Sequence, residues 1–175
     1  VLDFGCGAGS LLSQFDGIKK YGVEINPIAR EKALKNGINC HSTVKTLPLN
    51  HFDLIISHHA LEHVEDPLGE LRSLYKCLKT GSKICIVVPC DTKFYKYKPN
   101  DINQHLFSWS PMNLGNLTTI AGFEVIESYS ITHIWPPFKE KIVKFFGWKI
   151  FHFTCYLYGY LEKRWGQTKV IAQKI

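Results

Sequence analysis

Short apolar runs alternate with helix-like segments through the first 90 residues of the chain. The runs are rich in Val, Ile, Leu and Phe, and most are followed by Gly, Pro, Asn or Ser. Between the runs, apolar residues recur at helical spacing, as at positions 68, 71, 74, 75 and 78. This alternation predicts βαβ units around a parallel sheet. We expect strands at 1–4, 21–25, 38–41, 52–57 and 83–88 and helices at 10–18, 28–35 and 68–78.

A different pattern begins after an expected strand at 123–133, where Pro136-Pro137 opens an aromatic and basic segment. The apolar positions of residues 138–165 cover too much of a helix for one stripe, although Lys141, Lys144 and His152 can share a polar side. The segment can cap an apolar or lipid-linked acceptor, or lie in the plane of a membrane surface. It can also pack on the sheet or be buried in a homodimer.

Length and composition indicate one folded domain, residues 1–175. The chain is 45% hydrophobic with charges of both signs, which supports a substantial core. No run of about 20 apolar residues is present, so we expect no spanning helix. The six cysteines form no C-x-x-C pair, which favours buried thiols in a reducing, cytoplasmic setting. The net charge of +6 is largely local, since residues 136–165 carry six bases against two acids. We therefore expect an anionic substrate or surface rather than nucleic acid.

The first nine residues, Val1-Leu-Asp-Phe-Gly-Cys-Gly-Ala-Gly9, join the end of a buried strand to a glycine-rich turn. Glycines at 5, 7 and 9 let the backbone turn sharply and approach a ligand closely. The N–H groups of the expected following helix favour a carboxylate. The dinucleotide fingerprint G-x-G-x-x-G requires glycine where this chain has Ser10. Asp3, where strand meets loop, can accept hydrogen bonds from a ligand's amine or hydroxyl groups.

Glu24 stands at the end of the second expected strand, fifteen residues after Gly9. Ligands of open parallel sheets lie beyond the carboxyl ends of the strands, at the switch in strand order. A carboxylate at that place can accept hydrogen bonds from two ribose hydroxyls. The alternative is an ordinary surface carboxylate, and the preceding glycine loop favours the ribose role.

The acid two residues before G-x-G-x-G resembles the signature of class I S-adenosylmethionine-dependent methyltransferases. The segment Phe52-Asp-Leu-Ile-Ile-Ser-His-His-Ala-Leu-Glu-His-Val-Glu-Asp-Pro67 resembles the fourth-strand motif of their small-molecule, ubiquinone-biosynthesis-like group (methyltransferase domain types 11 and 23). The segments Leu78-Lys-Thr-Gly-Ser-Lys-Ile-Cys-Ile-Val-Val-Pro89, Gln104-His-Leu-Phe-Ser-Trp-Ser-Pro111 and Ala121-Gly-Phe123 resemble the parts that follow. The resemblance thus covers nearly the whole chain.

This resemblance implies a Rossmann-like α/β fold, doubly wound, with a mostly parallel seven-stranded sheet and helices on both faces. The last strand, at 168–174, is implied to be antiparallel, and residues 136–165 to be an insertion between strands six and seven. Family members cover the cofactor with N-terminal helices, so we expect such helices to be missing before Val1. The implied cofactor is S-adenosylmethionine, held by Asp3, Gly5, Cys6, Gly7, Gly9, Glu24, Ile25, Asn26, Thr43, Val44 and Ser57.

Within this set, the resemblance places Ile25 on the adenine ring and Asp3, Gly5 and Gly7 around the methionine part. Family members often carry an acid after strand three that binds the adenine amine. This chain has Ser42-Thr43-Val44-Lys45 there. We expect Thr43 and the backbone of Val44 to replace the acid, with weaker selectivity for adenine.

His59-Ala-Leu-Glu-His63 matches the zinc motif H-x-x-E-H, in which Glu62 would be the general base. The motif directly follows a strand, and Asp66-Pro67 ends any helix soon after it, so we expect no metal site. As a methyltransferase, the chain would instead use a histidine to deprotonate or orient the acceptor. The candidates are His59, His63 and His105. Cys6 and Cys90 lack an adjacent histidine in sequence, so we expect packing roles for both.

The sequence therefore predicts an enzyme that methylates a small molecule, most plausibly on an oxygen of a sugar, quinone, polyketide or lipid-linked glycan. Two other functions stay open. One is a methyltransferase-like domain that binds S-adenosylmethionine or a partner without turnover. The other is a nicotinamide-dependent oxidoreductase, which the glycine spacing disfavours.

Overall fold

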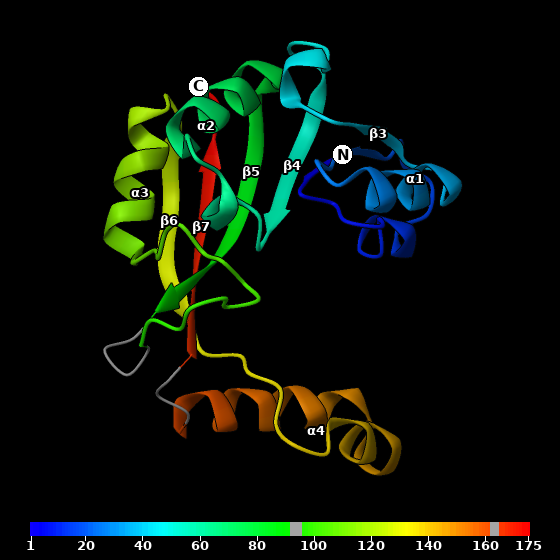
Figure 1. Cartoon of the computed structure of the whole chain (residues 1–175), viewed down its shortest axis with the longest axis vertical. Coiled ribbons are helices and arrows are strands. Elements are labelled where there is room, and N and C mark those ends of the chain that lie inside the picture. The colour runs from blue at the N-terminus through cyan, green and yellow to red at the C-terminus, as the bar shows by residue number, and fades with distance from the viewer. Residues whose placement is uncertain (92–95, 162–164) are drawn as a thin grey trace.

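The computed structural model describes residues 1–91, 96–161 and 165–175, and one seven-stranded sheet forms its centre (Figure 1). The strand order is β3-β2-β1-β4-β5-β7-β6. The order reverses between β1 and β4, which is where ligands of open α/β sheets bind. The strands are β1 (Leu2–Phe4), β2 (Tyr21–Val23), β3 (Asn39–His41), β4 (Phe52–His58), β5 (Leu78–Asp91), β6 (Glu124–Ile131) and β7 (Trp165–Gln173).

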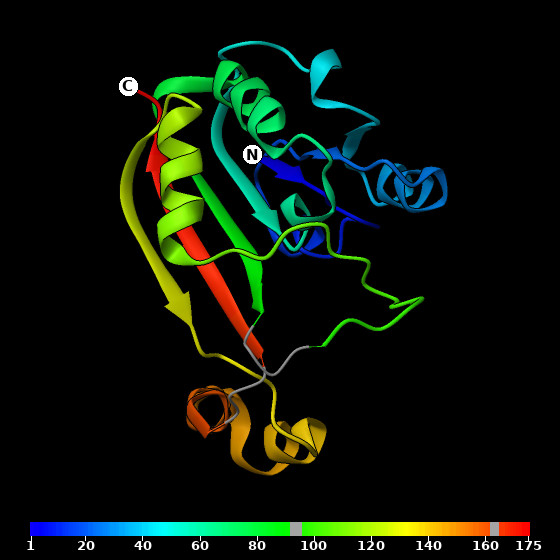
Figure 2. The same cartoon turned by 60° about the vertical axis from the view of Figure 1, so that its left-hand side comes forward.

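The strand directions confirm the predicted fold class. The pairs β1–β2, β1–β4, β2–β3 and β4–β5 are parallel. The last strand, β7, lies between β5 and β6 and is antiparallel to both. The carboxyl ends of β4, β5 and β6 therefore all point to one end of the sheet (Figures 1 and 2).

Helices cover both faces of the sheet, as predicted. Neighbouring residues of a strand point to opposite faces, and in β4 Ile55 belongs to the larger core while Ile56 packs on the smaller one. The larger core includes Leu71 and Leu114 from the helices on its face (Figure 2). The helices are α1 (Pro27–Lys35), α2 (Pro67–Cys77), α3 (Pro111–Ile120) and α4 (Lys139–Leu161), with 3-10 turns η1 (Leu12–Gln14), η2 (Val44–Thr46) and η3 (Leu61–His63).

The sequence is wrong about two local elements. The helix expected at 10–18 is only the 3-10 turn η1. There the side chains of Ser13 and Gln14 both donate to the Ser10 carbonyl, and such local bonds compete with helix formation. The strand expected at 83–88 is longer in the structure, because β5 begins at Leu78, directly after α2 ends at Cys77. Gly81 has a φ of 78°, and the β4–β5 register shifts between Phe52 and Leu54.

The helix α4 lies between β6 and β7 in sequence and stands apart from the sheet, beyond the carboxyl ends of the parallel strands (Figure 1). Gly147, with φ 74° and ψ 175°, divides it into two helical segments. This break explains why the apolar residues form no single stripe. The helix packs on the connection after β6, where the Ile134 N–H donates to the Cys155 carbonyl. The alternative of a helix packed on the sheet is therefore wrong.

We predict that Gly9→Ala lowers the free energy of unfolding by about 2–4 kcal/mol, because the added Cβ would meet the Ile38 side chain of the smaller core at a positive φ. Gly37→Ala is the matched control, since Gly37 has a similar positive φ but no heavy atom near its Cβ position. That control should lose only about 1–2 kcal/mol. Urea unfolding measures both values, and equal losses would contradict the proposed tight packing at Gly9.

Candidate functional site

The Glu24 carboxylate ties the glycine loop to the end of β2. Its Oε2 accepts a hydrogen bond from the Gly7 N–H at 2.9 Å, and its Oε1 accepts one from the Asn26 N–H at 2.8 Å. Arg30 fixes the same turn by donating from Nη1 to the Glu24 carbonyl at 2.8 Å. A carboxylate offers about four lone-pair sites, so two acceptor positions remain for hydroxyl groups of a ligand.

Three further amides of the loop also donate within the protein. Gly5 and Cys6 both donate to the Val23 carbonyl, and Gly9 donates to the Cys6 carbonyl. A Cβ at Gly5, where φ is 79°, would overlap the Ala60 side chain that follows β4. The loop is therefore packed between the ends of β2 and β4. The sequence predicts a helix after the loop whose N–H groups would bind a carboxylate of the ligand. This prediction is wrong, because only the 3-10 turn η1 follows the loop.

A cavity of about 990 Å³ opens beside this loop, at the carboxyl ends of β1, β2 and β4. The lining includes residues from the predicted cofactor set and two of the predicted histidines. Ile25 is 85% exposed at its rim, so a flat ring can rest on it. The predicted residues in the lining are Gly5, Glu24, Ile25, Thr43, Val44, His59 and His63.

Several predicted cofactor residues lie behind the lining. Gly7 and Asn26 hold the Glu24 carboxylate, and Gly9 packs on Ile38. Cys6 is buried in the smaller core, with its Sγ 3.5 Å from that of Cys40. Burial raises the pKa of the Cys6 thiol, which disfavours the thiolate and fits the expected packing role.

Asp3 and Ser57 are also buried, on adjacent strands at the switch in strand order. Ser57 Oγ has no hydrogen-bond partner among the described residues. Asp3 is 4% exposed, and burial, with a smaller effect of Glu24, raises its pKa to about 6. Protonated Asp3 therefore contributes to folding stability below its ordinary pKa near 4. This contribution is lost as the pH rises through about 6. A buried carboxyl of this kind gains from a nearby cation.

The three candidate histidines surround one buried carboxylate. Glu62 is 0% exposed, and its Oε1 lies 3.3 Å from His59 Nδ1 and 3.9 Å from His63 Nε2. The Glu62 carbonyl accepts the Leu106 N–H, which brings the neighbouring His105 ring to 5.1 Å from His63. Among the residues described, neither Glu62 carboxylate oxygen has a conventional hydrogen-bond partner.

His59 borders two cavities. It lines the cavity beside the glycine loop, and it also lines a second cavity of about 470 Å³ with His58 and His105. The far side of this second cavity includes Ile134 and Trp135, on the connection to α4. Of the three candidates, His63 lines only the first of these cavities and His105 only the second.

The helical zinc motif does not form. His59 has a φ of 55° outside any helix, and η3 is a single turn that starts at Leu61. A different set of groups does come together, since Glu62, His63 and His105 offer ligand atoms within 4.8 Å of one another and could hold a metal ion. Sequence spacing alone could not reveal it, because His105 arrives from a distant loop.

Sequence reasoning also missed residues that complete the site. From the sequence, Glu62 has a role only in the zinc motif, although an acid between two histidines just beyond a strand is a usable signal. His133 and Trp135 line the second cavity, yet nothing in their local sequence indicates this. They line the cavity because the connection after β6 passes beside it.

Comparison with known proteins agrees with this architecture. A family model described as a methyltransferase domain matches residues 1–128. Ubiquinone biosynthesis O-methyltransferase of Haemophilus ducreyi is 36% identical over 96 residues, 45% of this chain and 40% of that protein. Phosphoethanolamine N-methyltransferase 1 of Arabidopsis thaliana is 31% identical over 105 residues, 51% of this chain and 21% of that protein. The chain thus spans less than half the length of either relative.

A solved structure shows the same fold. Geranyl diphosphate C-methyltransferase from Streptomyces coelicolor A3(2), in complex with Mg²⁺, geranyl diphosphate and S-adenosyl-L-homocysteine, matches 99% of this chain and 70% of its own, with a TM-score of 0.70 and 12% identity. The family match covers well over half of the chain and confirms the resemblance, with S-adenosylmethionine as the cofactor of the family. This chain therefore belongs to the family of methyltransferase domains.

Proposed function

We propose that the chain is the catalytic domain of an S-adenosylmethionine-dependent methyltransferase that acts on an oxygen of a small-molecule acceptor. One observation carries the proposal: His59 lies between two cavities, with the buried Glu62 carboxylate 3.3 Å from its Nδ1. The larger cavity, beside the glycine loop, would take the cofactor. The second would take the acceptor.

The larger cavity fits the cofactor in three respects. Glu24 keeps two acceptor positions for ribose hydroxyls beside its bonds to Gly7 and Asn26. Ile25 offers exposed apolar surface for the adenine at the rim, and the buried Val44 lines the cavity. Asp3, buried at the junction of strand and loop, would face the cationic methionine part and gain charge stabilisation from it.

His59 would serve as the general base of the reaction. When bound, the cofactor supplies a methyl group on a sulfonium sulfur. The neutral thioether that remains after transfer is a good leaving group. Glu62 would accept a hydrogen bond from His59 Nδ1 and so direct Nε2 toward the acceptor. His59 would then take the proton of the acceptor hydroxyl. At the same time the hydroxyl oxygen would bond to the methyl carbon and the carbon–sulfur bond would break. Most of the rate would come from aligning the two reactants.

Oxygen is favoured over nitrogen by the site's own chemistry. A hydroxyl must lose its proton during transfer, and a histidine backed by a carboxylate is suited to accept it. The relative from Haemophilus ducreyi is named an O-methyltransferase. The relative from Arabidopsis thaliana is named an N-methyltransferase, so a nitrogen acceptor is the second candidate.

We predict that S-adenosylmethionine binds about tenfold more weakly at pH 5 than at pH 7. The pKa of Asp3 is about 6 without ligand, and a bound cation would lower it, so protonation below pH 6 opposes binding. Asp3→Asn should remove most of this pH dependence. Isothermal titration calorimetry over this range checks it, and an equal slope in both proteins would contradict the role of Asp3.

We predict that His59→Asn lowers the rate of methyl transfer at least about 100-fold while cofactor affinity stays within about twofold. Asparagine tolerates the positive φ at this position and can still donate to Glu62, but it cannot take a proton. The assay follows labelled methyl from S-adenosylmethionine into the small molecules of a cell extract. His51→Ala, outside both cavities, is the control.

Three results would contradict this proposal. Full activity of the His59→Asn variant would show that His59 is not the general base. Activity that chelation abolishes and a divalent metal restores would assign the acceptor hydroxyl to a metal at Glu62, His63 and His105 instead. Tight cofactor binding with no labelled product in extracts would favour a binding domain without turnover.

A further inference from the structure

The second segment of α4 has one side packed on the protein and an apolar side exposed. Phe151, Cys155 and Gly159 recur every four residues and are buried. A Cβ at Gly159 would overlap the Thr132 carbonyl, so the backbones are in close contact there. The residues on the opposite side are exposed and apolar or aromatic, namely Ile150, Phe153, Leu157 and Tyr160. An ordinary surface helix would carry polar residues on that side.

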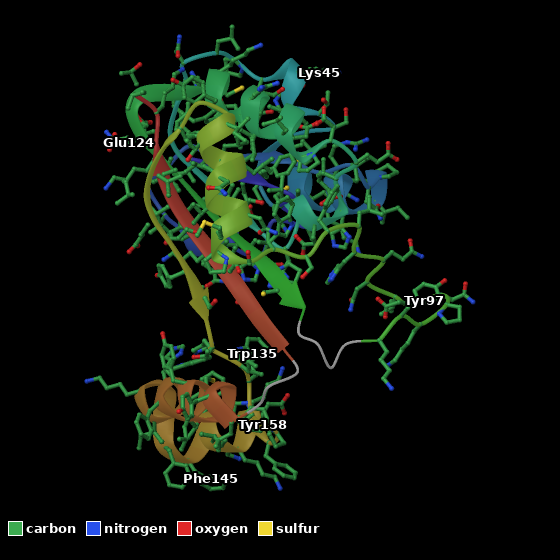
Figure 3. All side chains as sticks on the ribbon, turned by 90° about the vertical axis from the view of Figure 1, so that its left-hand side faces the viewer. Lys45, Tyr97, Glu124, Trp135, Phe145 and Tyr158 are labelled. Atoms are coloured by element: carbon green, nitrogen blue, oxygen red, sulfur yellow. The ribbon has the colours of Figure 1, made fainter. Side chains whose placement is uncertain are left out.

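Exposed aromatic residues continue across the break at Gly147. Phe145, Phe146 and Trp148 are 72%, 62% and 64% exposed. Figure 3 shows Phe145 on the side of α4 that faces away from the sheet, whereas Trp135 lies between α4 and the strands. Exposed apolar surface of this extent marks an interaction site rather than an ordinary solvent-facing helix.

The charges of α4 identify the kind of partner. Lys139, Lys141, Lys144 and Lys149 accompany these aromatic residues, with Glu140 as the one acid in 139–161. Lysine stems can lie along an apolar surface while their ammonium groups reach anionic headgroups. Exposed Trp and Tyr side chains suit the boundary between lipid and water. A twofold contact between copies would instead bring the lysines of both copies together.

We propose that α4 is an in-plane docking element for the surface of an anionic phospholipid bilayer. In the described parts of the chain, no helix is long and apolar enough to cross a membrane. Docking therefore inserts only the exposed aromatic side, and the buried side keeps the domain attached. Because α4 lies beyond the carboxyl ends of β4 and β5 (Figures 1 and 2), docking holds the sheet's ligand-binding end toward the bilayer.

Vesicle flotation tests this proposal and does not depend on methyl transfer. The protein should float with vesicles of phosphatidylcholine mixed with phosphatidylglycerol, and at least about tenfold less with phosphatidylcholine alone. Raising the salt concentration should release it from the anionic vesicles. Binding should shift the tryptophan fluorescence of the protein to shorter wavelength, and this shift should be smaller in the Trp148→Phe variant.

Two double variants separate the apolar and the charged contributions. Phe153→Ser with Tyr160→Ser and, separately, Lys144→Glu with Lys149→Glu should each lower vesicle binding at least about tenfold. The matched controls are Met112→Ser with Ile120→Ser on α3, and Lys32→Glu on α1 with Lys76→Glu on α2, all exposed positions. Circular dichroism and the melting temperature confirm that each variant is folded.

The proposal is overturned by no binding to either vesicle type, by equal binding to both, or by unchanged binding of the α4 variants. A dimer in light scattering that dissociates in the Phe153→Ser, Tyr160→Ser variant, without vesicle binding, would assign the face to a second copy. Intact vesicle binding with no methyl transfer would leave the docking element in place and contradict only the proposed reaction.

Discussion

The hydrogen bonds of the Glu24 carboxylate to the Gly7 and Asn26 N–H groups are the constraint on which the site depends. They hold the glycine loop against the end of β2, at the switch in strand order where such sheets bind ligands. The loop in turn packs on Ala60, so that the segment after β4 can approach no closer. One carboxylate thereby fixes the glycine-loop wall of the larger cavity, which His59 and His63 also line.

Buried acids of two kinds shape the rest of the site. Asp3 is buried with a pKa near 6 and gains from a cation beside it. Glu62 is fully buried beside His59 and His63, and burial of a carboxylate is costly unless charged or hydrogen-bonding groups face it. Burial of either acid costs folding stability, so stability alone gives no reason for it. The two buried acids are understandable where a cationic cofactor and a proton acceptor are required.

Much of the fold follows from local sequence signals. The alternation of strands and helices, the glycine loop and Glu24 at a strand end depend on neighbouring residues, and the observed topology confirms the fold class. The proximity of His105 to Glu62 and the wall formed by Trp135 could not be predicted, because they join residues far apart in the chain. The break of α4 at Gly147 does not follow from the sequence, because a single glycine lowers helix stability but does not by itself end a helix.

The most direct measurement is calorimetric titration of S-adenosylmethionine into the protein and its Glu24→Ala variant. Glu31→Ala, an exposed acid on α1, is the control. If the carboxylate at the end of β2 holds both the loop and the ribose, Glu24→Ala binds at least tenfold more weakly, a loss of about 1.4 kcal/mol, while the control is unchanged. Equal affinity of a folded Glu24→Ala variant, or binding of a nicotinamide dinucleotide instead, would contradict the account.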